Sequence, residues 1–162
     1  MKKEVLGISI LLALLISNSS IKAQVDYRTA MGVKFYPGAF SIKHFVTEKN
    51  AVEGLVYLWQ YGSRITGLYE FHRPLPGLGL ENLNWYVGVG GHVAFWNNRW
   101  EKFYPDRSNS IGIGVDGVIG LDWKIPGSPI NLSLDWQPSI NLVGYQYGEF
   151  GWGGVGIRYV LK

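Results

Sequence analysis

Long stretches of this chain alternate, residue by residue, between apolar side chains and polar or small ones. In residues 111–123, Ile, Val, Leu and Trp occupy most odd-numbered positions, and Gly, Asp and Val occupy the even-numbered ones. Side chains of a β-strand point alternately to its two faces, whereas an α-helix repeats about every 3.6 residues. No segment after residue 24 carries a convincing helical period. The alternation therefore predicts an all-β fold.

The alternation recurs in eight runs, separated by turn-forming residues such as Pro37-Gly38. The predicted strands are residues 27–36, 40–46, 52–60, 65–72, 84–95, 111–123, 130–137 and 154–161. Most are longer than the ~5–6 residues of ordinary globular strands and approach the ~9–11 residues with which a tilted strand crosses a bilayer. An even number of long strands predicts an eight-stranded antiparallel up-and-down transmembrane β-barrel.

The two faces of the predicted strands differ in their side chains. One face is almost purely apolar and aromatic, and the other combines Gly, Ser and Asn with charged residues. The charged residues assigned to the polar face are Arg28, Lys34, Lys43, Glu53, Glu70, Asp116, Asp122, Asp135 and Arg158. A soluble barrel with this face inside would lack an apolar core and would expose more apolar surface than the several hundred Å² tolerated on soluble monomers. Lipid around the apolar face removes this contradiction.

The charged residues of the polar face are therefore expected inside the barrel. Side chains just fill the interior of an eight-stranded barrel, and a buried charge requires a partner of opposite sign. Five of the nine residues are acidic and four are basic. We interpret them as a structural ion-pair network in a largely plugged lumen. An acid–base pair formed by Glu53 and Glu70 is the catalytic alternative.

Residues 1–23 have the features of a cleavable signal peptide. Lys2 and Lys3 precede the apolar run Val5–Ile16, and the small residue Ala23 stands before the predicted cleavage site. The apolar run is shorter than the ~20 residues of a membrane-spanning helix. We therefore predict export and a single mature domain, residues 24–162. The chain contains no cysteine, which excludes disulfides, thiolate metal sites and lipid attachment at the cleavage site.

The net charge of the chain gives no indication of a nucleic-acid partner. The formal value of +3 includes three lysines and one glutamate of the predicted signal peptide. The remaining chain is nearly neutral and carries no surplus of positive charge. Nucleic-acid-binding proteins display clusters of basic residues, so we expect no partner of this class.

A glycine motif occurs within one of the predicted strands. Gly112, Gly114 and Gly117 match the pattern G-x-G-x-x-G. This pattern binds dinucleotides where it connects a strand to a helix, and here it lies inside a strand. We therefore interpret the glycines as small residues that make room in a narrow lumen for large neighbours.

Two histidines are the remaining candidates for chemistry. His72 and His92 fall on the polar face of neighbouring predicted strands. They could assist a serine nucleophile such as Ser139 or hold a metal. However, no serine stands in register with either histidine, and the spacing matches no metal-ligand pattern. We predict no catalytic residue, no metal site and no cofactor.

The longest predicted connection, residues 97–110, mixes aromatic and basic side chains. Its candidate contact residues are Arg99, Trp100, Lys102, Phe103, Tyr104 and Arg107. Exposed aromatic residues together with Arg are typical of contact surfaces, which makes this loop a candidate for surface recognition. The alternative is that the loop packs on the barrel mouth near lipopolysaccharide phosphates.

Four runs carry a resemblance to a known group of proteins: GLYEFH (67–72), LNWYVGVGGH (83–92), LDWQPS (134–139) and GIRY (156–159). Together with the strand pattern of the whole mature chain, they resemble the small eight-stranded outer-membrane β-barrel proteins common in Bacteroidetes, within the wider OmpX/OmpW-like group. The resemblance implies the outer membrane of a Gram-negative bacterium as the location. The implied partners are outer-membrane lipid, lipopolysaccharide and the barrel-assembly machinery.

Three functions are compatible with such a barrel. The preferred one is a non-enzymatic integral membrane protein with a structural or surface-interaction role. The second is a small barrel that binds or transports a small molecule. The third is an outer-membrane enzyme that modifies lipid. A lumen filled with paired charges favours the first, and conductance across a planar bilayer would separate the first from the second.

Overall fold

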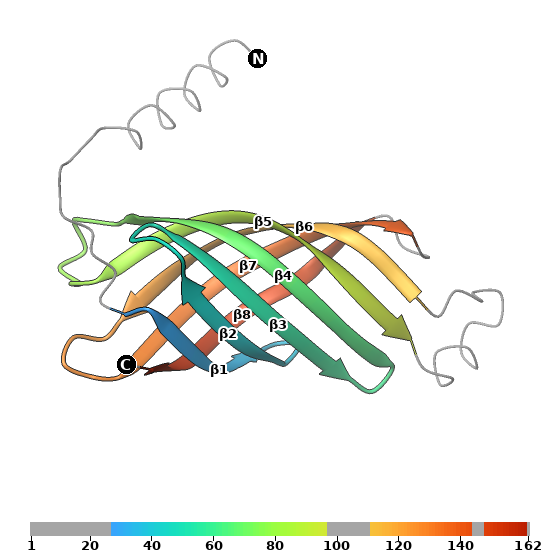
Figure 1. The fold of residues 1–162 in the computed structure, drawn as a ribbon, viewed down its shortest axis with the longest axis horizontal. Helices are drawn as coiled ribbons and strands as arrows, with labels where there is room; N and C mark the ends of the chain where they lie inside the picture. The colour runs from blue at the N-terminus through green and yellow to red at the C-terminus, as the bar shows by residue number, and fades with distance from the viewer. Residues whose placement is uncertain (1–26, 97–110, 144–147, 162) are drawn as a thin grey trace, which may run out of the picture.

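The computed structural model describes residues 27–96, 111–143 and 148–161, and its regular elements are all β-strands. The strands are β1 (Thr29–Phe35), β2 (Ala39–Phe45), β3 (Asn50–Trp59), β4 (Gly62–Pro74), β5 (Leu83–Trp96), β6 (Ile111–Lys124), β7 (Ile130–Val143) and β8 (Gly148–Leu161). Each pairs antiparallel with the next along the chain, and β8 pairs with β1, which closes the barrel (Figure 1). The predicted all-β, eight-stranded antiparallel barrel is confirmed.

The barrel has two distinct ends. At one end Thr29 of β1 pairs with Leu161 of β8, and we call this the terminal end. The connections β2–β3, β4–β5 and β6–β7 lie there, whereas the connections β1–β2 and β3–β4 lie at the far end. The predicted signal peptide, residues 1–23, falls outside the described residues. Within the part of the chain that the structure describes, no helix is long and apolar enough to cross a membrane.

Several strands are longer than the alternation indicated. The pairing of β4 with β3 begins at Gly62, and the pairing of β8 with β7 begins at Gly148, ahead of the predicted starts at residues 65 and 154. The added residues, 62–64 and 148–153, include four glycines. Glycine pairs through its backbone but contributes nothing to an alternation of apolar and polar side chains. β4 has 13 residues and β5 to β8 have 14 each.

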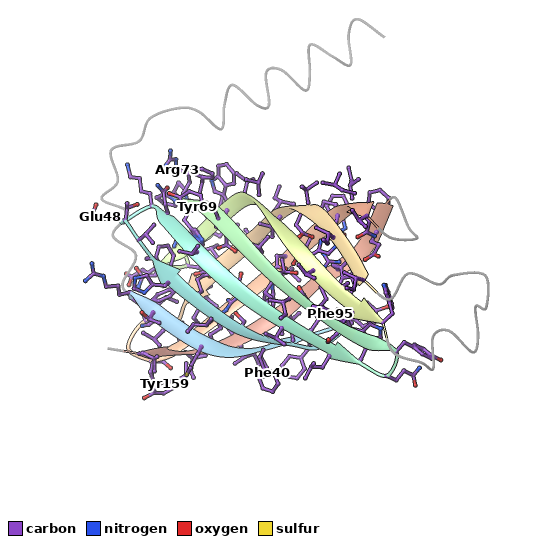
Figure 2. All side chains as sticks on the ribbon, turned by 45° about the vertical axis from the view of Figure 1, so that its right-hand side comes forward. Phe40, Glu48, Tyr69, Arg73, Phe95 and Tyr159 are labelled. Carbon is purple, nitrogen blue, oxygen red and sulfur yellow. The ribbon has the colours of Figure 1, made fainter. Side chains whose placement is uncertain are left out.

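The two faces of the strands separate as the sequence predicts. In β2, buried Ser41 and Lys43 alternate with exposed Phe40 and Ile42. Figure 2 shows labelled side chains such as Phe40 and Tyr159 directed away from the barrel wall. Apart from Arg73 near the end of β4 (Gly62–Pro74), the described Asp, Glu, Lys and Arg side chains of the strands turn instead toward the barrel axis, where neighbouring strands can pair them.

The glycine motif of residues 112–117 lies entirely within β6. A Cβ atom at Gly114 would lie 2.5 Å from the ring carbon Cε1 of His92 and 2.4 Å from the carbonyl oxygen of Ile140. The missing side chain therefore provides the room that His92 occupies in the lumen. The geometry agrees with the predicted role for Gly114, whereas a Cβ atom at Gly112 or Gly117 would meet its nearest neighbour at an ordinary 3.6 or 3.7 Å. The segment lies within a strand and lacks the strand-to-helix turn of a dinucleotide site.

β1 and β2 have 7 residues each, half the 14 residues of β5 to β8. The register between β1 and β8 stops at Phe35 and Val155, so the first part of β8, Gly148 to Gly154, pairs with β7 alone among the described strands. Glycines occupy the point of separation, where Gly153 and Gly154 have φ of 122° and 125°. Both values favour residues without a Cβ atom. The barrel wall is therefore shorter at the far end, beside the β1–β2 hairpin.

Candidate functional site

The outer wall of the barrel is the largest apolar surface in the structure. Outward-facing positions carry Val, Ile, Leu, Phe, Tyr and Trp along every strand, for example Val89, which is 65% exposed. Arg73, near the end of β4, is the one Asp, Glu, Lys or Arg side chain among the outward-facing strand positions that the structure describes. A soluble monomer rarely exposes an apolar patch larger than a few hundred Å². The exposed apolar side chains of this wall come from all eight strands.

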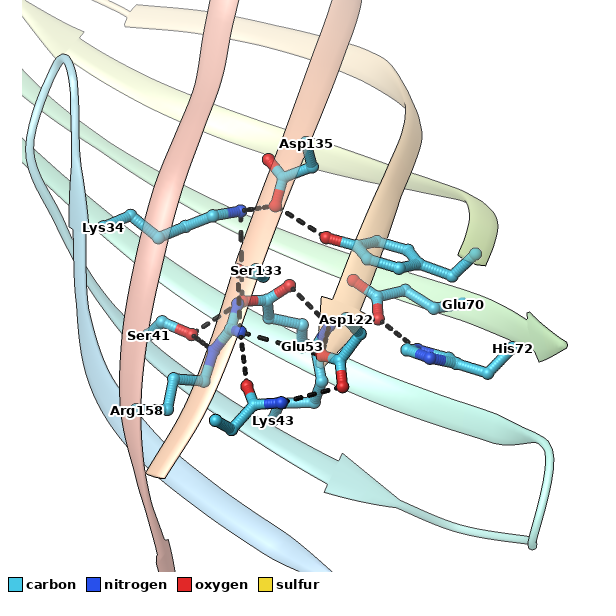
Figure 3. Close-up of polar contacts among 12 residues, drawn as sticks. Lys34, Ser41, Lys43, Glu53, Glu70, His72, Asp122, Ser133, Asp135 and Arg158 are labelled. Carbon is cyan, nitrogen blue, oxygen red and sulfur yellow. Dashed lines mark hydrogen bonds and ion pairs between the residues drawn. The ribbon is translucent and has the colours of Figure 1, made fainter. Parts of the chain in front are cut away.

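The lumen contains a first group of paired charges, which we call the terminal cluster. It consists of Lys34, Lys43, Glu53, Glu70, Asp122, Asp135 and Arg158 (Figure 3). These seven residues come from seven different strands and are at most 7% exposed. All seven were predicted from the alternation to face the lumen. Their convergence confirms that they form a buried ion-paired network.

Arg158 is held from several sides in the terminal cluster. Its guanidinium pairs with Glu53 and donates hydrogen bonds to the hydroxyl oxygens of Ser41 (2.7 Å) and Ser133 (2.9 Å) and to the amide oxygen of Asn131 (3.1 Å). A buried guanidinium is stable only when its donors are satisfied. These partners from β2, β3 and β7 therefore fix Arg158 near the axis.

Lys43 is the second centre of the terminal cluster. Its Nζ atom lies 2.7 Å from Glu70, 3.4 Å from Asp122 and 3.5 Å from Glu53. It also lies 4.2 Å from the centre of the Tyr86 ring. One cation thus joins three carboxylates from β3, β4 and β6, which cross-links the barrel through its interior.

Lys34 joins the terminal cluster to β7. Its Nζ atom lies 2.8 Å from Asp135, and the hydroxyl of Tyr86 donates a 2.6 Å hydrogen bond to the same carboxylate. Tyr86 in turn stacks on His72 with ring centroids 4.7 Å apart, and His72 contacts Glu70 at 2.9 Å. A continuous network therefore runs from β1 across the lumen to β4.

The terminal cluster contains one more carboxyl group than it has lysine and arginine side chains. Glu53, Glu70, Asp122 and Asp135 face Lys34, Lys43 and Arg158. Three carboxylate oxygens of the cluster, Glu53 Oε2, Glu70 Oε1 and Asp135 Oδ1, have no hydrogen-bond partner among the described residues, and neither has His72 Nδ1. Among the described residues, Glu70 and Asp135 each contact one lysine, Lys43 and Lys34 respectively. Glu53 contacts Lys34, Lys43 and Arg158.

A second group of paired charges, the distal cluster, lies toward the far end. Arg64 of β4 pairs with Asp116 of β6 and, at 3.1 Å, with Glu149 of β8. His92 lies 3.0 Å from Asp116 and 2.7 Å from the amide oxygen of Asn141. Both ring nitrogens of His92 are thus occupied, and neither contacts a serine. The arrangement lacks the serine–histidine contact of a nucleophilic site.

Aromatic rings cover the distal cluster. Trp152 lies 4.2 Å above the guanidinium of Arg64 and packs edge-on against Tyr57 and Trp59, with ring centroids 4.8 and 5.4 Å apart. Trp59 also packs against Trp96. We call Tyr57, Trp59, Trp96 and Trp152 the aromatic cap. Its contacts join β3 to β8 where the short β1–β2 hairpin leaves them without an intervening strand.

An apolar layer separates the two clusters. In the strand ladder, Leu68 stands between Glu53 of the terminal cluster and Gly90, which is paired with Asp116 of the distal cluster. Leu68 packs in one buried group with Ala39, Leu55, Tyr57, Tyr86 and Val118. The sequence predicts a polar, ion-paired lumen, and the structure adds buried apolar groups to it.

A smaller apolar group fills the lumen at the terminal end. Tyr27, Ala30, Phe45 and Ala51 pack together there. The hydroxyl of Tyr27 lies 3.1 Å from Asp122, and burial, followed by the charge of Asp122, raises the pKa of this hydroxyl well above its usual value. Tyr27 therefore closes the terminal end with its ring and donates a hydrogen bond to the cluster.

Arg28 is the predicted lumen residue that the structure places elsewhere. Eight of the nine predicted residues are buried inside the barrel, whereas Arg28 is exposed. Tyr27 and Ala30 are both buried, which shows that strict alternation has not begun at this point. β1 starts only at Thr29, so the period of two could not assign Arg28 to a face.

Sequence reasoning missed Arg64 and Glu149. The predicted strand began at residue 65, so Arg64 was left in a turn. It shares the inner face with Thr66 and Glu70, and a strand start at Gly62 would have revealed it. Glu149 lies in the glycine-rich beginning of β8, where no alternation is visible. The predicted contact loop, with residues 99–107, lies outside the described residues.

Within the described residues, no group of three or more His, Cys, Asp or Glu side chains could hold a metal ion. Comparisons with known proteins give no further indication of chemistry. No protein-family model, curated protein or solved structure matches the chain. The residues and their geometry therefore carry the functional argument alone.

Proposed function

We propose that this protein is an integral β-barrel of a bacterial outer membrane, with an ion-paired, plugged lumen and a non-enzymatic structural or surface-interaction role. The observation that carries the proposal is the apolar outer wall of a closed barrel. A closed barrel satisfies its own backbone hydrogen bonds, as a hydrocarbon environment requires. Water on both sides would leave this wall as a surface on which chains aggregate.

The dimensions of the barrel support membrane insertion. A strand of 14 residues extends about 46 Å at ~3.3 Å per residue. A tilt of ~35–45° leaves roughly 33–38 Å along the axis, which exceeds an apolar band ~25 Å tall. The charged residue Arg73 stands near the end of its strand, where the polar boundary of a membrane would lie.

The layered lumen supports a role that does not involve transport. Two clusters of paired charges, the apolar layer between them and the aromatic groups at the two ends occupy the axis of the barrel. A barrel of eight strands has an interior that side chains just fill. Under this proposal the activity of the protein resides on its surface, and the loop of residues 97–110 is the candidate for recognition outside the cell.

The resemblance to small outer-membrane barrels supports the same location. With both termini in the periplasm, the far end of the barrel, where β5 ends and β6 begins, faces outward, and the β2–β3 and β6–β7 turns face the periplasm. Lipid, lipopolysaccharide and the barrel-assembly machinery are then the expected partners.

The decisive experiment is fractionation of a Gram-negative host that produces the full chain. We expect the protein in the outer membrane, extractable by detergent and not by carbonate, with faster gel mobility before heating than after it. A monodisperse folded protein in detergent-free buffer would overturn the proposal. In planar bilayers we expect no discrete conductance steps. A steady conductance would support the transport alternative instead.

A further inference from the structure

A hollow of about 550 Å³ opens on the outside of the barrel at the terminal end. It lies between the β2–β3 turn and the end of β4, and its lining combines charged, polar and aromatic groups. The lining residues are Thr47, Glu48, Lys49, Asn50, Phe71 and Arg73. Figure 2 shows Glu48 and Arg73 at the same end of the barrel, with Tyr69 further along the wall.

The β2–β3 turn that forms one side of the hollow is well fixed. The hydroxyl oxygen of Thr47 accepts hydrogen bonds from the backbone N–H groups of Lys49 (3.3 Å) and Asn50 (3.0 Å). The backbone N–H of His72 donates a 2.7 Å hydrogen bond to the carbonyl oxygen of Lys49. This last bond holds the backbone of Lys49 beside His72, the residue that precedes Arg73, so the backbone of the turn is fixed at the end of β4 before any ligand binds.

The charged side chains at the hollow form no ion pair within the part of the chain that the structure describes. Among the described residues, no ion pair within 4.0 Å involves Glu48, Lys49 or Arg73. All three side chains are exposed. Two cations and one carboxylate therefore remain available at the same opening, and guanidinium and ammonium groups are the usual partners of phosphate.

The floor of the hollow is continuous with the apolar wall. Phe71 is 43% exposed and packs edge-on against Tyr69, with ring centroids 5.1 Å apart. Arg73, the charged residue of the outward-facing strand positions, thus stands directly above two aromatic rings on the same face of β4. At a membrane boundary, charged groups likewise lie on the water side of apolar groups.

We propose that this hollow binds the headgroup of a zwitterionic phospholipid with a primary ammonium group, such as phosphatidylethanolamine. Lys49 and Arg73 hold the phosphate, Glu48 accepts hydrogen bonds from the ammonium, and the acyl chains lie along Phe71 and Tyr69. The combination of both charge signs with an apolar floor is complementary to this class of lipid. A free inorganic anion would use the two cations and leave Glu48 and Phe71 without a role. The proposal rests on membrane insertion as proposed above.

The test is lipid retention by the full, folded barrel in detergent micelles. Dioleoyl-phosphatidylethanolamine is added, and bound lipid is counted by native mass spectrometry. We expect the K49Q/R73Q double variant to retain at least about fivefold less of this lipid, because charge-assisted hydrogen bonds to phosphate are lost. The matched control is R28Q, which removes an exposed cation at the same end outside the hollow and is expected to leave retention within about twofold of the unchanged protein.

A second variant tests the assignment of Glu48. We expect E48Q to shift the preference from phosphatidylethanolamine toward phosphatidylglycerol by about fivefold or more, since the ammonium loses its acceptor and a repulsive carboxylate is removed. Equal retention by K49Q/R73Q and R28Q would overturn the proposal. Displacement of the lipid by millimolar inorganic phosphate would also overturn it, in favour of a simple anion site.

Failure of this inference is distinguishable from failure of the proposed function. Heat-modifiable gel mobility and outer-membrane fractionation are recorded for every variant. If K49Q/R73Q inserts normally but retains lipid like the unchanged protein, the headgroup site alone is refuted. A chain that folds in detergent-free buffer refutes membrane insertion and the lipid site with it.

Discussion

The ring of Tyr86 in β5 lies over Gly120, its cross-strand partner in β6. A Cβ atom at Gly120 would stand 2.8 Å from Cζ of that ring and 2.6 Å from Cβ of Asp135. The bare backbone of Gly120 therefore lets Tyr86 reach across to Asp135, where its hydroxyl donates a 2.6 Å hydrogen bond. This relationship shows how an inner glycine provides space for a polar network.

Alanine at Gly120 is expected to destabilise the barrel. The added methyl group must displace Tyr86 or Asp135, and overpacking of this kind costs about 1–3 kcal/mol. The matched control is G67A, because a Cβ atom at outward-facing Gly67 would meet nothing within 4 Å. Urea unfolding of the protein in lipid vesicles measures both variants. Equal stability of G120A and G67A would contradict the account of Tyr86.

Glutamine substitutions of the two glutamates in the terminal cluster should lower the free energy of unfolding by different amounts. Glu53 pairs with Arg158 and lies 3.5 Å from Lys43 and 4.0 Å from Lys34, so E53Q weakens the pairing of three cations. Breaking a buried pair in this way costs about 3–5 kcal/mol. E70Q is expected to cost less, because Lys43 is the single lysine or arginine in contact with Glu70 and the cluster loses its excess carboxyl.

The measurement for this pair is the free energy of unfolding in the same vesicles. Both variants are isosteric with the original side chain, so packing is conserved and the comparison reports on charge. A loss for E70Q as large as the loss for E53Q would show that the excess carboxyl is compensated by a partner that the described contacts do not contain.

Removal of the Trp152 ring should open the aromatic cap. W152A loses the contact with Arg64 and the edge-on contacts with Tyr57 and Trp59, and truncation of a packed tryptophan costs about 3–5 kcal/mol. W152F keeps a ring in place and loses the hydrogen bond to Glu149, so its loss should be smaller. Unfolding free energies of both variants test the cap, and similar losses would assign its effect to Glu149 instead of packing.

The alternation of the sequence predicts the wall of the barrel well. It identified the eight strands, their closure and the inner position of eight of the nine charged residues assigned to the polar face. It did so because each side chain of a strand points either into the barrel or away from it. The residue types on the two faces differ, so the sequence distinguishes the faces. The prediction was wrong for Arg28, which precedes the first regular strand residue Thr29, and it missed Arg64, which follows a turn.

The height of each residue in the lumen could not be predicted in the same way. A period of two assigns a face and says nothing about position along the axis, which depends on the register of neighbouring strands. That register brings Leu68 between Glu53 and the partner of Asp116. It therefore divides one expected network into two clusters with an apolar layer between them.

Two arginine substitutions on the outer wall test whether hydrocarbon surrounds the barrel. Val89, midway along β5, is 65% exposed, and V89R should cost about 2–4 kcal/mol in lipid vesicles because a charge near the bilayer centre is poorly solvated. L161R, at the terminal end, should cost at most about 1 kcal/mol. If water surrounded the wall, both exposed positions would accept arginine with changes within about 0.5 kcal/mol. Equal, small losses would therefore contradict membrane insertion.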